Sequence, residues 1–176
     1  MTDAPALMRA MARNNAWAGR TLHAACARLS PEAFEAPRTG FFGSIGATLR
    51  HVLAVDRYYL DALEQGGRGR AVYDDPEPQG QAALAAAQAE ADARLIRFCE
   101  ALRAEDLPRE LPTDRGEAGR VSERIDALLL HLFQHQIHHR GQAHTMVLEA
   151  GIDPPQLDDF HLQFGRVPSA RAYCGG

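Results

Sequence analysis

The sequence has no long apolar run, no cysteine pairs with metal-site spacing and no dense block of basic residues. No stretch approaches the roughly 18 apolar residues of a membrane span, and charged residues interrupt the first 30, so neither a membrane segment nor a signal peptide is expected. The three cysteines, Cys26, Cys99 and Cys174, lie far apart, which predicts free thiols and a cytoplasmic protein. Because the net charge is −4 and the arginines are scattered, no nucleic-acid partner is expected.

Runs of β-branched residues with alternating polarity are also missing, which argues against long strands. Alanine and leucine recur with helical spacing instead, and 176 residues suffice for one domain with a sizeable core. We therefore expect an all-α fold, a single four-helix-bundle domain over residues 1–176, with helices at about residues 4–29, 45–64, 81–103 and 122–150. Ser44 is the expected N-cap of the second helix, and Ser122 with Glu123 opens the fourth.

The connections and the tail are expected to be irregular. Residues 66–79 read as a surface loop, and residues 104–120 as a polar loop with a hairpin-like pattern. In the tail, residues 151–176, four apolar side chains are expected to anchor the chain on the bundle: Leu157, Phe160, Leu162 and Phe164.

Half of the eight histidines lie in the nine positions from His131 to His139. At 100° per residue, His135 and His139 fall on the face of the last helix that is marked by apolar residues, namely Val121, Ile125, Leu128, Leu132 and Met146. At this spacing the two imidazoles are one turn apart, with roughly 6 Å between Cβ atoms, and can share one cation. Two buried neutral imidazoles otherwise need partners for four nitrogens.

A third ligand has to come from another helix, because one straight helix does not surround a metal. His51 borders the inner face of the second helix and is the candidate, although a lone inward histidine is more often a hydrogen-bonded core residue. His131 and His138 are expected near the site or at the surface, and His144 in solvent. Candidates for lining the pocket are Trp17, Tyr58 and Tyr59.

The last helix carries a second apolar face, formed by Leu130, Phe133, Ile137 and Leu148. A helix with two apolar faces buries both, so this face packs either on the tail or on a second copy of the chain, and we favour a homodimer. Arg140 reads as an anion clamp or as the ion-pair partner of a neighbouring carboxylate, and we favour the ion pair.

Several enzyme classes are excluded by residue type. A zincin needs Glu after the first histidine, but Gln136 follows His135. A ferritin-like di-iron bundle needs Glu three positions before a histidine, where this chain has Leu132 and Gln136. A cysteine–histidine nucleophile, by contrast, stays open, but only if Cys26 or Cys99 opens into the pocket.

The segment His131–Gln142, HLFQHQIHHRGQ, resembles the H-x-x-x-H-x-x-[HY]-H-R-G-Q signature of the DinB/YfiT-like superfamily. The stretch from Ser44 to Leu60 is similar to the second-helix motif of that family, and Met11–Ala18 to its start. The resemblance implies a four-helix bundle in up-up-down-down order, often a homodimer, with one divalent metal on three histidines. These fall on His51, His135 and His139.

Characterised relatives of that kind include transferases and isomerases that use thiols such as bacillithiol or mycothiol. The resemblance therefore implies a metal-dependent thiol S-transferase or isomerase acting on a small electrophile, with zinc or nickel as the metal and a low-molecular-weight thiol as cosubstrate. Two alternatives stay open: metal-assisted hydrolysis, and a non-catalytic stress-induced protein that binds metal or a small ligand.

Overall fold

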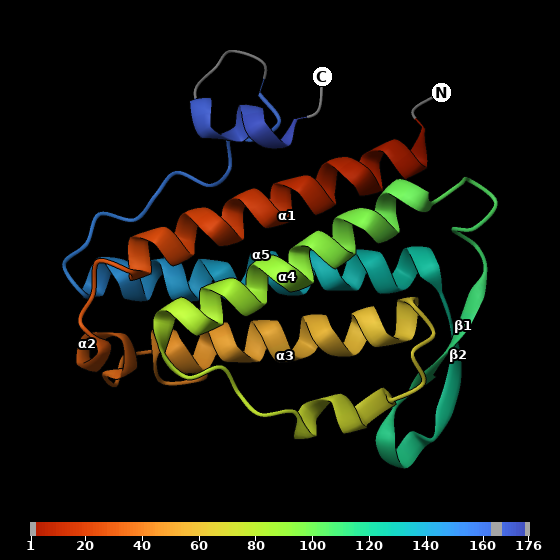
Figure 1. Ribbon diagram of the computed structural model, residues 1–176, viewed down its shortest axis with the longest axis horizontal. Coiled ribbons are helices and arrows are strands. Elements are labelled where there is room, and N and C mark those ends of the chain that lie inside the picture. Colours follow the sequence, from red (N-terminus) through yellow and green to blue (C-terminus); the bar gives the residue numbers. More distant parts are fainter. Residues whose placement is uncertain (1–2, 163–166, 175–176) are drawn as a thin grey trace.

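A computed structural model describes residues 3–162 and 167–174 of the chain. Its body is made of the four long helices α1 (Ala4–Cys26), α3 (Ile45–Leu63), α4 (Gly80–Ala101) and α5 (Ile125–Glu149) (Figure 1). The connections contain α2 (Pro31–Glu35), the strands β1 (Glu110–Asp114) and β2 (Arg120–Arg124), and three 3₁₀ turns, η1 (Gly69–Asp74), η2 (Gly116–Ala118) and η3 (Pro168–Tyr173). The predicted helical bundle is confirmed. None of the described helices has the length and apolarity to cross a membrane.

The long helices run in up, down, down, up order, and not in the expected up-up-down-down order. Arg13 in the first half of α1 pairs with Glu100 at the end of α4, so these two helices are antiparallel. The expectation was wrong because residues 64–79, which include η1, run back along the bundle, so that α4 starts at the same end as α3 (Figure 1). Helix α5 then returns antiparallel to α3 and parallel to α1 (Figure 1).

The start of α3 follows the sequence prediction, whereas the start of α5 does not. Ser44 caps α3, since its Oγ accepts a hydrogen bond from the Ala47 amide at 3.0 Å. Val121 and Ser122 instead lie in β2, and α5 begins at Ile125. The residues predicted for the first turn of the helix pair with β1 instead.

The polar segment before α5 forms a two-stranded antiparallel hairpin, in agreement with its hairpin-like pattern. Only two of its side chains, Leu111 and Thr113, are buried, which leaves little apolar periodicity to read from the sequence. Gly116 and Gly119 occupy the turn at φ 65° and 74°, a conformation that favours glycine.

The tail docks on α1. Phe160 is buried against Trp17, with ring centroids 5.5 Å apart, and Leu157 packs on the same small cluster, as predicted. Leu162 is half exposed and is therefore not an anchor. Phe164 lies outside the described residues.

Candidate metal centre

The three histidines singled out from the sequence converge between α3 and α5. His51 comes from α3, and His135 and His139 come from consecutive turns of α5. One ring nitrogen of each lies within 4.8 Å of the other two, and the Nε2 atoms of His51 and His135 are 3.0 Å apart. Because α3 and α5 are antiparallel neighbours, residues 84 positions apart in the sequence share one site.

The chemistry of this donor set fits a divalent transition metal. Burial and the neighbouring imidazoles lower the pKa of His135 to about 3, and burial followed by His139 lowers the pKa of His51. Both rings are therefore neutral at neutral pH and present lone pairs. Zinc and nickel accept neutral imidazole nitrogens as ligands, and the three ring nitrogens lie close enough together to hold one ion.

Two contacts orient the ligands. His139 Nδ1 donates to Gln142 Oε1 at 2.8 Å, one turn further along α5, which leaves the Nε2 lone pair of His139 free for an ion. Phe42 stacks on the ring of His51 with centroids 4.1 Å apart and also meets the ring of His139 edge-on. Sequence analysis missed Phe42, although its place just before the cap of α3 and between Gly40 and Gly43 marks a shaped loop.

Replacing Gln142 with alanine is expected to weaken metal binding by about 10–100-fold, because a ligand loses the partner that fixes its tautomer and orientation. Gln134→Ala is the matched control, since Gln134 is an exposed glutamine on the same helix with no hydrogen bond among the described residues. Competition titration with a chromogenic chelator measures both variants. Equal affinities for the two would show that Gln142 has no role in holding His139.

A pocket of about 270 Å³ opens beside His135. Tyr58 and Tyr59 line it, as predicted. Arg115 forms its far side, with an ion pair to Glu123 at 2.6 Å and a hydrogen bond to Tyr59 Oη at 2.9 Å. A small molecule in this pocket would therefore contact His135, one of the three candidate ligands.

Trp17 does not line this pocket, contrary to prediction, because it packs under the tail and donates to Ser169 Oγ at 3.1 Å.

The remaining histidines of α5 lie outside the cluster. His131 and His138 are exposed, as expected, with the ring of His131 5.0 Å from that of Tyr59. His144 is not in free solvent: it is half-buried and donates to the Pro155 carbonyl at 3.0 Å, because the tail passes over this part of α5.

Behind the histidines, six buried polar side chains form a closed ring of hydrogen bonds across the core. This core polar ring takes side chains from all four long helices: Asn15, Asp56, Gln88, Asp92, Gln136 and Arg140. Gln88 Nε2 bridges the two carboxylates, at 2.7 Å from Asp56 Oδ2 and 3.2 Å from Asp92 Oδ1. The ring links the four long helices to one another by hydrogen bonds. Two of its members, Gln136 and Arg140, directly follow His135 and His139 in the sequence.

Arg140 is hydrogen-bonded to amides and not directly paired with a carboxylate, so the predicted ion pair is wrong. Its Nη1 donates to Asn15 Oδ1 and, at 2.9 Å, to Gln136 Oε1. Burial raises the pKa of Asp56 to about 7 and that of Asp92 to about 6, while the two carboxylates offset part of the burial cost of Arg140. The two carboxyl groups thus act on the Arg140 charge through space and not through a direct contact.

The buried cysteines do not supply a nucleophile. Cys26 and Cys99 are both buried, and burial raises the pKa of each thiol to about 12. A thiol that stays protonated inside the core excludes the cysteine–histidine mechanism that the sequence left open for these two residues.

Comparisons with known proteins agree on the family and on the fold. The DinB family model matches residues 1–166. No curated protein matches the chain. Among solved structures, a DinB-like protein of Bacillus subtilis, YjoA, is 18% identical over 84% of this chain and 96% of its own, with a TM-score of 0.62. At this identity the likeness shows the fold alone.

Proposed function

The chain belongs to the DinB family, and from this premise we propose that it binds one divalent metal ion through His51, His135 and His139. We further propose that the loaded protein is a thiol S-transferase or isomerase acting on a small electrophile, with zinc or nickel as the metal and a low-molecular-weight thiol as cosubstrate. The observation that carries the proposal is the convergence of three imidazoles on one point, with no carboxylate in the group.

The metal, when bound, lowers the pKa of a coordinated thiol and so supplies a thiolate at neutral pH. Side chains of the protein shield the site, bind the electrophile and accept the proton. Phe42 covers the outer face of His51 and limits access of water, while the tyrosine-lined pocket beside His135 takes the electrophile. His131 lines the same pocket and is available to accept the thiol proton.

The test is a panel of cellular thiols with monochlorobimane as the electrophile, using zinc- and nickel-loaded protein. We expect a metal-dependent rate above background with at least one thiol, lost in His139→Ala and retained in Gln134→Ala, a change at an exposed residue of the same helix. If the protein binds metal but shows no metal-dependent rate with any thiol, the transferase proposal is refuted and a non-catalytic metal-binding protein is favoured. Hydrolysis is less favoured because no carboxylate base belongs to the histidine cluster of the described chain.

We also propose a homodimer through the outer face of α5. Leu130, Ile137 and Leu148 are 51%, 52% and 57% exposed and lie on one stripe of the helix. Phe133, which was assigned to the same face, is buried in the core of the same chain. The tail passes beside this stripe but leaves Ile137 half exposed.

Replacing Ile137 with arginine is expected to convert the dimer into a monomer, because a charge at the centre of an apolar contact loses its hydration without a partner. Light scattering after size exclusion measures the mass. Ala83→Arg, on the exposed face of α4, is the control and should remain dimeric. A parent protein that is monomeric at every concentration would contradict the proposal.

A further inference from the structure

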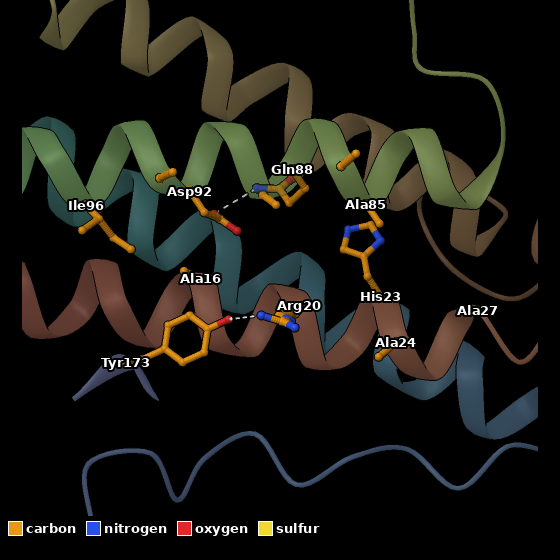
Figure 2. Close-up of a pocket in the computed structure, with 13 residues that line it drawn as sticks. Ala16, Arg20, His23, Ala24, Ala27, Ala85, Gln88, Asp92, Ile96 and Tyr173 are labelled. Atoms are coloured by element: carbon orange, nitrogen blue, oxygen red, sulfur yellow. Dashed lines mark hydrogen bonds between the residues drawn. The ribbon is translucent and has the colours of Figure 1, made fainter. Parts of the chain in front are cut away.

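A second hollow lies between α1 and α4, on the other side of the bundle from the histidine cluster. This α1/α4 groove has a volume of about 510 Å³, which is within the range of small-molecule sites. Its walls carry seven alanines, so the space between the two helices is left open by small side chains and not filled by them. Tyr173 from η3 and Arg20 stand at its rim (Figure 2).

Three buried polar side chains border the groove: His23, Gln88 and Asp92, which are 8%, 3% and 4% exposed. Figure 2 shows the Asp92 carboxylate directed from α4 into the space in front of α1, and the His23 ring reaching from α1 toward α4. Asp92 Oδ1 accepts from Asn15 and Gln88, but Oδ2 accepts from no described residue. Gln88 Oε1 is buried without a partner, and the His23 ring forms no hydrogen bond within the described chain.

The charge at the groove favours a cation. Asp92 belongs to the core polar ring, in which Arg140 is the one cationic side chain and donates to Asn15 and Gln136, not to either carboxyl group. Arg20 does not supply the missing charge: it is exposed, makes no ion pair in the described part of the chain, and donates to Tyr173 Oη at 3.5 Å. A hydrogen-bond donor with one positive charge matches the free carboxylate oxygen, and an apolar body matches the alanine walls.

We propose that the α1/α4 groove binds a small organic monocation of the alkylammonium class, with its ammonium group on Asp92 and its hydrocarbon body against the alanine walls. The site is separate from the histidine cluster and requires neither the metal nor a thiol. Helices α1 and α4 form it from residues that the metal centre does not use.

The proposal is tested by titrating hexylammonium, hexanol and hexanoate into the full-length protein as purified, with calorimetry and amide NMR shifts as readouts. We expect saturable binding of one hexylammonium per chain, with shifts centred on α1 and α4, and an affinity at least roughly tenfold above that of hexanol. Hexanol binding as tightly as hexylammonium would reduce the site to an apolar groove and overturn the proposal. Shifts centred elsewhere would also overturn it.

Two variants test the Asp92 charge and the volume of the groove separately. Ala89→Leu fills the groove from an exposed position of α4, and Ala83→Leu is the matched control on another face of the same helix. We expect Ala89→Leu to weaken hexylammonium binding at least roughly tenfold and Ala83→Leu to leave it within about twofold. Asp92→Asn should abolish the preference over hexanol. If Asp92→Asn does not fold, as judged by circular dichroism, Ala89→Leu still decides, and unchanged binding in it refutes the site.

Discussion

Replacing Arg140 with methionine is expected to lower the free energy of unfolding by about 3–5 kcal/mol at pH 8, because it leaves two buried carboxyl groups without a cation. Urea denaturation followed by circular dichroism measures the change. The cause lies in the core polar ring, where Asp56 and Asp92 are both nearly fully buried and depend on one guanidinium. The same variant also removes the donor to Asn15 and Gln136.

The loss should shrink at pH 5. In the folded chain the pKa values of Asp56 and Asp92 are raised to about 7 and about 6, so the folded state takes up protons that the unfolded state does not. Their stabilising contribution is present at low pH and is lost as pH rises through these values. At pH 5 both carboxyl groups are neutral and no longer need Arg140.

Two controls separate charge from volume in the Arg140 variant. Arg97→Met makes the same substitution at an exposed arginine on α4 and should change stability by less than about 0.5 kcal/mol. Adding Asp92→Asn to Arg140→Met should recover part of the loss. A cost for Arg140→Met that equals the cost for Arg97→Met, or that does not vary with pH, would refute the charge-balance account of the ring.

Removal of the metal with a chelator is expected to leave a folded helical protein that is less stable than the loaded form. At free metal 1,000-fold above Kd, binding adds about 4 kcal/mol to the free energy of unfolding. The apo-protein should stay folded because the apolar core between the four helices does not use the histidines, and only His139 of the three is fully buried. Thermal unfolding with and without zinc or nickel measures the difference.

In His139→Ala the free energy of unfolding should no longer depend on metal. Only two of the three imidazole ligands remain, and both are only half-buried. Gln134→Ala, at an exposed residue of the same helix, is the control and should retain the metal dependence of the parent. A chelated parent that loses its helical circular dichroism signal would assign the site a structural role and favour the non-catalytic reading over an enzyme.

The histidine cluster was accessible to sequence analysis because helical periodicity is a local property. At 100° per residue, the apolar pattern of one helix was enough to place His135 and His139 on its inner side. The pattern of the second helix made His51 the candidate third ligand, and the motif resemblance fell on the same three residues. What local patterns do not encode is how helices are arranged. The path of residues 64–79 along the bundle decides the direction of α4. The periodicity within a helix does not predict that direction.

The core polar ring and the contact of Phe42 with the histidines also depend on residues that are far apart in the sequence, so local patterns do not predict them. Gln88 stands in the apolar stripe of α4, which is a visible signal of an unusual buried amide, but one of its two partners, Asp56, lies on another helix, α3. Phe42 reaches His51 and His139 only because the loop before α3 folds over them. Trp17 was misplaced for the converse reason: a large aromatic suggests a pocket, but here it anchors the tail.

The most direct test of the account is the metal content of protein purified without a histidine tag, measured by mass spectrometry beside His51→Ala and His139→Ala. We predict close to one divalent ion per chain in the parent and little in either variant, because each variant removes one of three ligands. No metal in the parent, even after reconstitution with zinc and with nickel, would contradict the account. The three histidines would then be a hydrogen-bonded cluster in the bundle and not a metal centre.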